Sequence, residues 1–210
     1  MSKNISQKLL SILMPSLGVM VWAAAFIDVI TKGQQIINSD GDLGRHITVG
    51  NYILDSHTIP LQDLFSHTMT GEPFTPHEWL SEVIFALANR AFGLNGVILL
   101  TALIIATSFW LVYFLSRRGR RLFFPLLLVG VLILLTSQIH WLARPHIFTF
   151  LLLALWMLVL EQMKNGKVSS WWLLPLLMLL WVNLHGAFIA GFATWFLYGA
   201  GLLWDKVLFK

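Results

Sequence analysis

Residues 38–94 read NSDGDLGRHITVGNYILDSHTIPLQDLFSHTMTGEPFTPHEWLSEVIFALANRAFGL, the one long polar stretch in an otherwise apolar chain. Most of the acidic residues and more than half of the histidines of the protein lie in it. They are Asp40, Asp42, Asp55, Asp63, Glu72, Glu78 and Glu82, with His46, His57, His67 and His77. Hydrophobic segments flank the stretch on both sides. We therefore expect it to form a loop between membrane spans and to carry the functional site.

The composition of the chain is that of an integral membrane protein. Of its 210 residues, 57% are hydrophobic and only 11% are charged, and the mean hydropathy is +0.75. Soluble globular domains carry roughly 25% charged residues. The absence of cysteine excludes disulfides and thiolate metal sites. Ten tryptophans suit helices that end at the lipid–water interface.

Hydrophobic segments long enough, or nearly long enough, to cross a membrane recur along the chain, since a spanning helix needs about 20 mostly apolar residues. They are Leu9 to Ile30, Leu94 to Leu115, Leu122 to Trp141, Ile147 to Leu160, Trp171 to Leu184 and Ala187 to Trp204. The sequence therefore predicts an all-α polytopic protein, a single membrane domain over 1–210 with about six transmembrane helices. A large external loop covers 31–93, and spans two to six cover 94–210.

The basic residues predict the orientation of these spans, because Lys and Arg concentrate in cytoplasmic loops. With both termini inside, the internal group is Lys3, Lys8, Arg117, Arg118, Arg120, Arg121, Lys164, Lys167, Lys206 and Lys210. The smaller external group is Lys32, Arg45, Arg90 and Arg144. We expect an inner-membrane protein with cytoplasmic termini and a periplasmic first loop. The arginine run at 117–121 is then a topology determinant near anionic lipid, not a nucleic-acid site.

The histidines were not used for this orientation, yet all seven fall on the external side. Four lie in the first loop, His140 and His146 flank the turn between spans three and four, and His185 lies between spans five and six. The sequence thus predicts one face that collects the titratable groups.

Two amphipathic helices are expected inside the loop. Apolar residues at helical spacing follow Asp42, a plausible N-cap, as far as Leu54. The pattern becomes helical again from Pro76, with Glu78 and Glu82 in the first two turns, where the helix dipole favours anions. Both helices would lie on the membrane surface. Glu78 and Glu82, one turn apart on the same helix face, would be two solvated acids or, alternatively, would share a cation.

These motifs resemble the N-terminal part of the GT-C superfamily, integral membrane glycosyltransferases that use polyprenyl-phosphate-linked sugars. The run DGDLGRHITVGNYILDSHTIPLQDLFSHTMTGEPFTPHEWLSEVIF is similar to the first-loop signature of a bacterial group of such proteins. ARPHIFTF and LWVNLHGAFIAGF resemble later segments of the same group. The chain differs in having Leu43-Gly44-Arg45 in place of the usual aromatic pair before the histidine. It covers the N-terminal half of these longer proteins.

The resemblance implies sugar transfer from a polyprenyl-phosphate donor to an external acceptor. Asp42 would be the catalytic base or acceptor-positioning acid, with Asp40 as the competing carboxylate, since the chemistry needs a group that takes a proton from a hydroxyl. The alternative for Asp42 is a simple helix cap. A divalent cation at the Asp42 loop would be the one possible cofactor.

Substrate-binding residues are expected on both sides of the loop. His77 and Glu78 would position an acceptor or stabilise phosphate, or else close the loop by a capping bond. Arg144, with His146 and His185 nearby, would hold a lipid phosphate, because a guanidinium binds phosphate bidentately. The alternative for Arg144 is a salt bridge to a loop acid.

Other chemistries lack their signatures. No metal ligand set is predicted, because the histidines do not show the i, i+4 spacing of a helix-borne site. The sequence contains no phosphate-binding glycine loop, G-x-S-x-G, H-E-x-x-H or dinucleotide fingerprint. Two hypotheses remain: a membrane glycosyltransferase, or a non-catalytic GT-C-derived subunit that packs against other membrane proteins.

Overall fold

The computed structural model describes residues 15–39, 41–116, 123–166 and 171–208, and over these residues all named elements are helices, without a strand. The elements are α2 (Leu17–Thr31), α3 (Gly33–Asn38), α4 (Leu43–Ser56), α5 (Trp79–Ser116), α6 (Phe123–Ser137), η1 (Gln138–His140), α7 (His146–Lys164), α8 (Leu173–Leu184), η2 (Gly186–Phe188) and α9 (Ile189–Leu208). The all-α prediction is confirmed.

Three helices are long and apolar enough to cross a membrane: Trp79–Ser116, His146–Lys164 and Gly186–Val207. Shorter apolar helices occupy Leu17–Thr31, Gly130–His140 and Leu173–Leu184. Each of the six predicted spans therefore coincides with an apolar helix, and three of these meet the length of a spanning helix.

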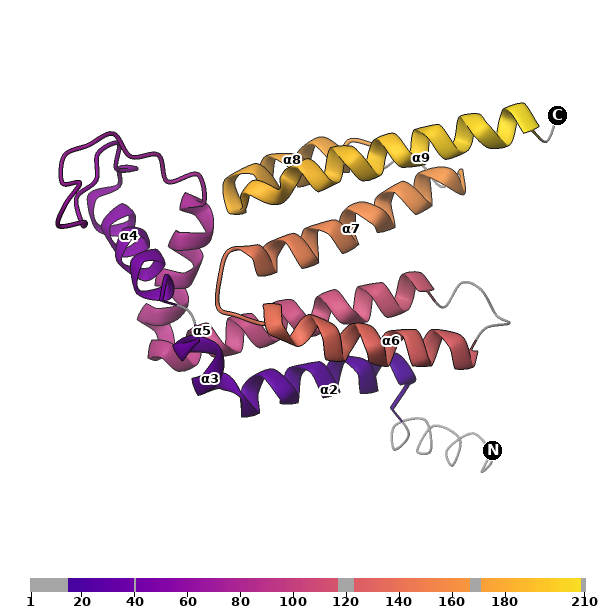
Figure 1. Ribbon diagram of the computed structural model, residues 1–210, viewed down its shortest axis with the longest axis horizontal. Coiled ribbons are helices and arrows are strands. Elements are labelled where there is room, and N and C mark those ends of the chain that lie inside the picture. The colour runs from indigo at the N-terminus through magenta and orange to yellow at the C-terminus, as the bar shows by residue number, and fades with distance from the viewer. Residues whose placement is uncertain (1–14, 40, 117–122, 167–170, 209–210) are drawn as a thin grey trace, which may run out of the picture.

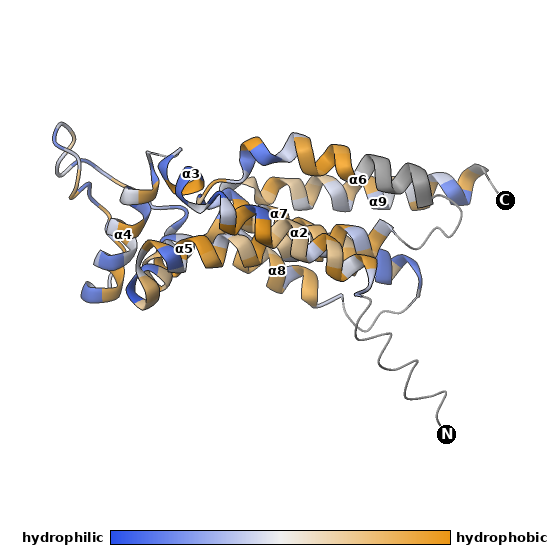
Figure 2. Ribbon diagram, turned by 90° about the horizontal axis from the view of Figure 1, so that it is seen from below, coloured by the Kyte–Doolittle hydropathy of each residue, from blue (hydrophilic) through white to orange (hydrophobic). Residues whose placement is uncertain are grey.

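The long helices form a bundle, and the polar stretch forms a cap at one end of it (Figure 1). Helices α2, α6, α7, α8, α9 and the second part of α5 run along the long axis. Helix α4, the loop after it and the first part of α5 lie across the end of the bundle. Figure 2 shows hydrophobic residues along the bundle and many hydrophilic ones in the cap.

A kink in α5 joins the cap to the bundle. Its backbone leaves the helical region at Phe92 and Gly93, where Gly93 has φ 61° and ψ −154°. This conformation is essentially restricted to glycine. The kink falls immediately before Leu94, where the hydrophobic segment begins, so the polar part of α5 turns into the cap and the apolar part enters the bundle.

Helix α4 packs against the first part of α5 through a face centred on His46. The buried residues of α4 are Leu43, His46, Val49, Gly50 and Ile53. The two backbones meet at Gly50, where an added Cβ would lie 2.0 Å from the carbonyl oxygen of Glu82. The amphipathic pattern that suggested a membrane-facing helix thus supports helix–helix packing.

The loop between α4 and α5 is held by its own hydrogen bonds. Asp63 N donates to Glu72 O at 2.8 Å, Gly71 N donates to Asp63 O at 2.8 Å, and Gln62 forms a β-bridge with Pro73. The carboxylate of Asp63 accepts from two backbone amides and from the Ser66 hydroxyl. The segment from 61 to 76, which its turn-forming residues predict to be irregular, has bends, turns and one isolated bridge in the structure, and these hydrogen bonds hold it together.

Candidate functional site

An ion pair between Asp42 and Arg144 joins the cap to the bundle across 102 residues of sequence. Asp42 stands at the N-cap position of α4, but its carboxylate makes no capping hydrogen bond within the described part of the chain. It bonds the guanidinium of Arg144 instead. The salt bridge that was one alternative for Arg144 is present, and Asp40 lies outside the described residues.

The turn before α7 places Arg144 at this end of the bundle. Arg144 N donates to Leu142 O at 2.8 Å, and Pro145 is the N-cap of α7. Ala143 is fully buried. The buried alanine and the proline fix the backbone on both sides, so the arginine side chain is directed to the cap, where it stays partly exposed.

Glu78 and His185 meet where the start of α5 touches the end of α8. The Nε2 atom of His185 lies 3.5 Å from Oε1 of Glu78, and the Nε2 atom of His77 lies 4.0 Å from the same oxygen. Nearby, the indole of Trp79 donates to Asn183 Oδ1 at 2.7 Å, which ties the two helices together. Glu78 is thus flanked by two imidazoles, of which His77 is largely exposed.

His185 makes a second contact that sequence reasoning missed. Its Nδ1 atom lies 2.8 Å from the hydroxyl of Thr149, which in turn accepts from the indole of Trp181 at 2.9 Å. Helical spacing could have indicated both partners: Thr149 follows His146 by three residues and Trp181 precedes His185 by four. The signal was hidden because a threonine and a tryptophan in apolar helices are typical packing residues.

His146 lies between the two contacts at the outer end of α7. Its Nε2 atom is 2.6 Å from the carbonyl oxygen of His140, and because a carbonyl only accepts, this nitrogen carries the hydrogen. Its ring centroid lies 6.4 Å from that of His185 and 5.5 Å from that of Phe150. The predicted residues His77, Glu78, His146 and His185 therefore form one cluster.

The pKa of His185 is lowered from 6.5 to about 4. Burial away from water is the largest cause, and the neighbouring imidazoles of His146 and His77 add to it. The Glu78 carboxylate, 3.5 Å from Nε2, is beyond ordinary hydrogen-bond distance. The imidazole is therefore neutral at physiological pH.

Glu82 is buried, so the expectation that it is solvated was wrong. It is 0% exposed, and its Oε1 atom lies 3.0 Å from Arg45 Nη1 and 3.2 Å from His46 Nδ1. Its Oε2 atom has no hydrogen-bond partner among the described residues. The error arose because Glu82 faces α4 at the close approach of Gly50, a contact that its helical spacing from Glu78 could not indicate.

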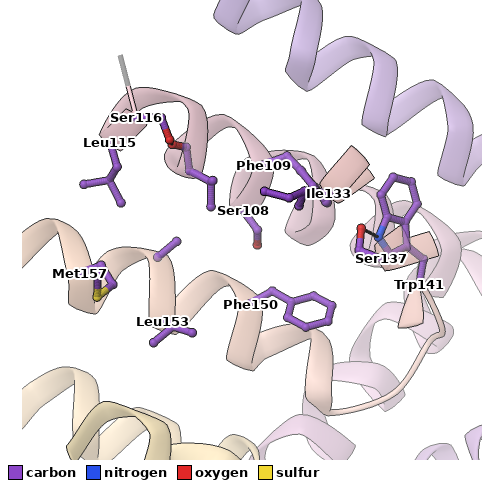
Figure 3. Close-up of a pocket in the computed structure, with 12 residues that line it drawn as sticks. Ser108, Phe109, Leu115, Ser116, Ile133, Ser137, Trp141, Phe150, Leu153 and Met157 are labelled. Carbon is purple, nitrogen blue, oxygen red and sulfur yellow. Dashed lines mark hydrogen bonds between the residues drawn. The ribbon is translucent and has the colours of Figure 1, made fainter. Parts of the chain in front are cut away.

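An apolar cavity of about 420 Å³ lies in the bundle below the cluster, between α5, α6 and α7 (Figure 3). Figure 3 shows Phe150, Leu153 and Met157 along α7 on one side and Ser108, Phe109 and Leu115 of α5 on the other. Trp141 closes one end, with its indole donating to Ser137 at 3.2 Å. Phe150, which lines the cavity, also contacts the ring of His146 in the cluster.

Among the described residues, Asp42 is paired with a cation and is not grouped with metal-ligating side chains. The guanidinium of Arg144 binds its carboxylate. In the described ranges, no three side chains of the metal-ligating types are grouped closely enough to share an ion.

Together, these contacts place Asp42, Arg144, His77, Glu78, His146 and His185 at the capped end of the bundle. They lie in two groups, the Asp42–Arg144 pair and the histidine–Glu78 cluster, which the turn from Arg144 to His146 connects. Comparisons with protein-family models, curated proteins and solved structures found no match to this chain.

Proposed function

We propose that the chain is a GT-C-like membrane module that binds a polyprenyl-phosphate-linked sugar and transfers the sugar to an external acceptor. The observation that carries the proposal is the contact between a residue that lines the apolar cavity and a residue of the polar cluster. Phe150 and Trp141 line the cavity, the ring of Phe150 lies 5.5 Å from that of His146, and Arg144 follows Trp141 by three residues in the sequence. An isoprenoid chain fits the apolar part, and a phosphate fits the arginine.

The proposed topology follows the basic residues. Six spans cross the inner membrane, both termini are cytoplasmic, and the cap is periplasmic. The single-ended distribution of the histidines and the length of three of the helices support this arrangement. The cap would then lie on the outer membrane surface, over the mouth of the cavity.

Phosphate binding at Arg144 would proceed by exchange. A guanidinium holds phosphate with two parallel hydrogen bonds, as it holds a carboxylate. An incoming lipid phosphate therefore competes with Asp42 for Arg144, and binding frees the Asp42 carboxylate to orient the acceptor hydroxyl. In the transfer, the acceptor oxygen bonds to the anomeric carbon, and the bond from that carbon to the phosphate oxygen breaks.

The test is binding and transfer by the purified chain in nanodiscs, with a polyprenyl-phosphate-linked sugar as donor and native mass spectrometry as the readout. Arg144→Ala should weaken binding at least tenfold, since hydrogen bonds to charged groups contribute about 1.5–3 kcal/mol. Arg90→Ala is the matched control. Arg90 also pairs with a cap carboxylate, Asp55 at 2.6 Å, and is similarly exposed.

Equal weakening by the two arginine variants, or no donor binding by the wild-type chain, would contradict the proposal. The alternative function is that of a non-catalytic subunit that packs in a larger membrane complex. It is favoured by the segment around α9, of which only 6% is buried, compared with 50% and 44% for the other two long spans. Co-purification of stoichiometric partner subunits without a polyprenyl lipid would support this alternative.

A further inference from the structure

We propose that Thr149 is a positioning residue that holds His185 as a neutral imidazole with its Nε2–H toward Glu78, so that Glu78 is the proton acceptor of the site. The inference rests on the proposed transfer function and deepens it. It assigns the base role to a carboxylate other than Asp42. It also assigns a positioning role to Thr149 and Trp181, two residues of apolar helices.

The direction of the hydrogen bonds follows from what each group can donate. The indole of Trp181 only donates, so Thr149 Oγ1 must be its acceptor. The hydroxyl hydrogen of Thr149 is then available for Nδ1 of His185, 2.8 Å away. The amide of Ala187 points to the same Nδ1 atom at 3.4 Å. Two donors directed at Nδ1 leave the hydrogen of the neutral ring on Nε2.

The Nε2 side of His185 faces the carboxylate. Oε1 of Glu78 lies 3.5 Å from Nε2, and the side chain of His185 is largely buried. The groups that face His185 are Glu78 and His77 from the start of α5 and His146 from α7. His185 lies in the turn between α8 and η2, outside the spanning helices, and its lowered pKa is consistent with a neutral ring.

A neutral partner keeps Glu78 available as a base. In the part of the chain that the structure describes, the ion-pair contacts of the Glu78 carboxylate are to the two imidazoles. Asp42 contacts a guanidinium instead, and arginine stays charged at every physiological pH. Protonation of Asp42 would remove the negative charge that the Arg144 guanidinium contacts, whereas protonation of Glu78 beside a neutral imidazole breaks no pair of opposite charges.

The proton step is balanced without a further reagent. The hydrogen of the acceptor hydroxyl passes to a carboxylate oxygen of Glu78 as the acceptor oxygen bonds to the anomeric carbon. The electron pair of the broken carbon–oxygen bond stays on the lipid phosphate, which Arg144 binds. His185 keeps its Nε2–H directed toward Glu78, 3.5 Å away, and neither gains nor loses a proton.

The test is nitrogen NMR of the full chain in nanodiscs with ¹⁵N-labelled histidine rings, with the His185 signals identified from the H185Q variant. In the wild-type protein, Nδ1 should be unprotonated and Nε2 protonated at pH 7, and the ring should remain neutral down to about pH 5. An imidazolium at pH 7, or the opposite tautomer, would overturn the proposal. This readout needs no substrate, so it fails or succeeds independently of the proposed transfer.

Thr149→Val removes the hydroxyl and nearly preserves the shape of the side chain. We expect both tautomers in this variant, while the ring stays neutral at pH 7, because the burial and the neighbouring imidazoles that lower its pKa are unchanged. Thr149→Ser should restore the wild-type spectrum. Thr194→Val is the control, because the Thr194 hydroxyl bonds only backbone carbonyls of α9 in the described structure. Unchanged His185 signals in Thr149→Val would overturn the positioning role.

A second test measures kcat for sugar transfer, under the conditions in which the wild-type chain is active. Glu78→Gln should reduce kcat at least a hundredfold with donor binding retained, since general base catalysis contributes about 10²–10⁴-fold. The acidic limb of the kcat profile should move to higher pH in Thr149→Val and return in Thr149→Ser. Full activity of Glu78→Gln would overturn the assignment of the base.

Discussion

At the scale of single residues, the acids of the cap differ in burial and in ion-pair partners, and their spacing in the sequence does not reveal these differences. Glu78 and Glu82 are one helical turn apart, yet Glu78 reaches two imidazoles at the surface of the cluster and Glu82 is fully enclosed by α4. A charge that is buried must be paired. Arg45 and His46 provide the pairing of Glu82.

Removal of the Glu82 carboxylate should therefore be costly. We expect Glu82→Ala to lower the free energy of unfolding by about 3 kcal/mol, the scale observed when one partner of a buried pair is removed. Asp55→Ala, which removes an exposed partner of Arg90, should cost less than about 1 kcal/mol. Denaturant unfolding in detergent, followed by tryptophan fluorescence, measures both. Equal losses would show that the buried cluster does not stabilise the cap.

His185 should make the stability of the protein depend on pH. Its pKa is about 4 in the folded protein and about 6.5 when the chain is unfolded. Between these values the unfolded chain binds more protons, so stability is greatest above pH 6.5 and falls as the pH is lowered toward 4. The thermal unfolding temperature of H185Q should fall less steeply over this window. H67Q, which changes an exposed loop histidine, should keep the wild-type slope.

At the scale of elements, the sequence was informative where hydrophobic period and helix length agree. It predicted the helices at α4, α5 and α7, because their patterns are long and regular. It could not show which face of α4 is buried or that Asp42 does not cap its helix. Both depend on a partner distant in sequence: α5 for the face, and Arg144 for the carboxylate. The contact of Thr149 with His185 was missed for the same reason.

The crossing of α4 and α5 predicts opposite effects for two glycines of the same helix. Gly50→Ala would place a methyl group 2.0 Å from a carbonyl oxygen, and overpacking of this kind costs about 1–3 kcal/mol. A Cβ at Gly44 would meet nothing within 4 Å, so Gly44→Ala should stabilise α4 by about 0.5–1 kcal/mol. The free energy of unfolding in detergent should therefore decrease for Gly50→Ala and increase for Gly44→Ala. A tolerated Gly50→Ala would mean that the helices are farther apart than described.

At the scale of the whole molecule, the expectation of a single polar end agrees with the arrangement of the bundle, where all seven histidines lie at the capped end. The single polar end could be predicted from the sequence, because polar and apolar residues are arranged in separate blocks along the chain. It could not predict which cap residues touch which helix ends. That information lies in contacts such as Trp79 to Asn183, which connect segments 104 residues apart.

The proposed topology predicts opposite accessibility for the two ends. The chain contains no cysteine, so a single introduced thiol reports its own position. A membrane-impermeant thiol reagent should label His67→Cys in intact cells and label Lys164→Cys only after the membrane is opened. Ser66→Cys is not a suitable reporter, because Ser66 holds the Asp63 turn. Labelling of both sites in intact cells would contradict the proposed orientation.

The ion pair between Asp42 and Arg144 also has a consequence for biogenesis. Asp42 leaves the ribosome about a hundred residues before its partner, and His185 follows later still, so the cap emerges long before the groups that secure it. During that interval the Asp42–Arg144 and Glu78–His185 contacts cannot form. Both contacts become possible only after α7 and α8 have been synthesised. The final arrangement of the polar end therefore depends on the last third of the chain.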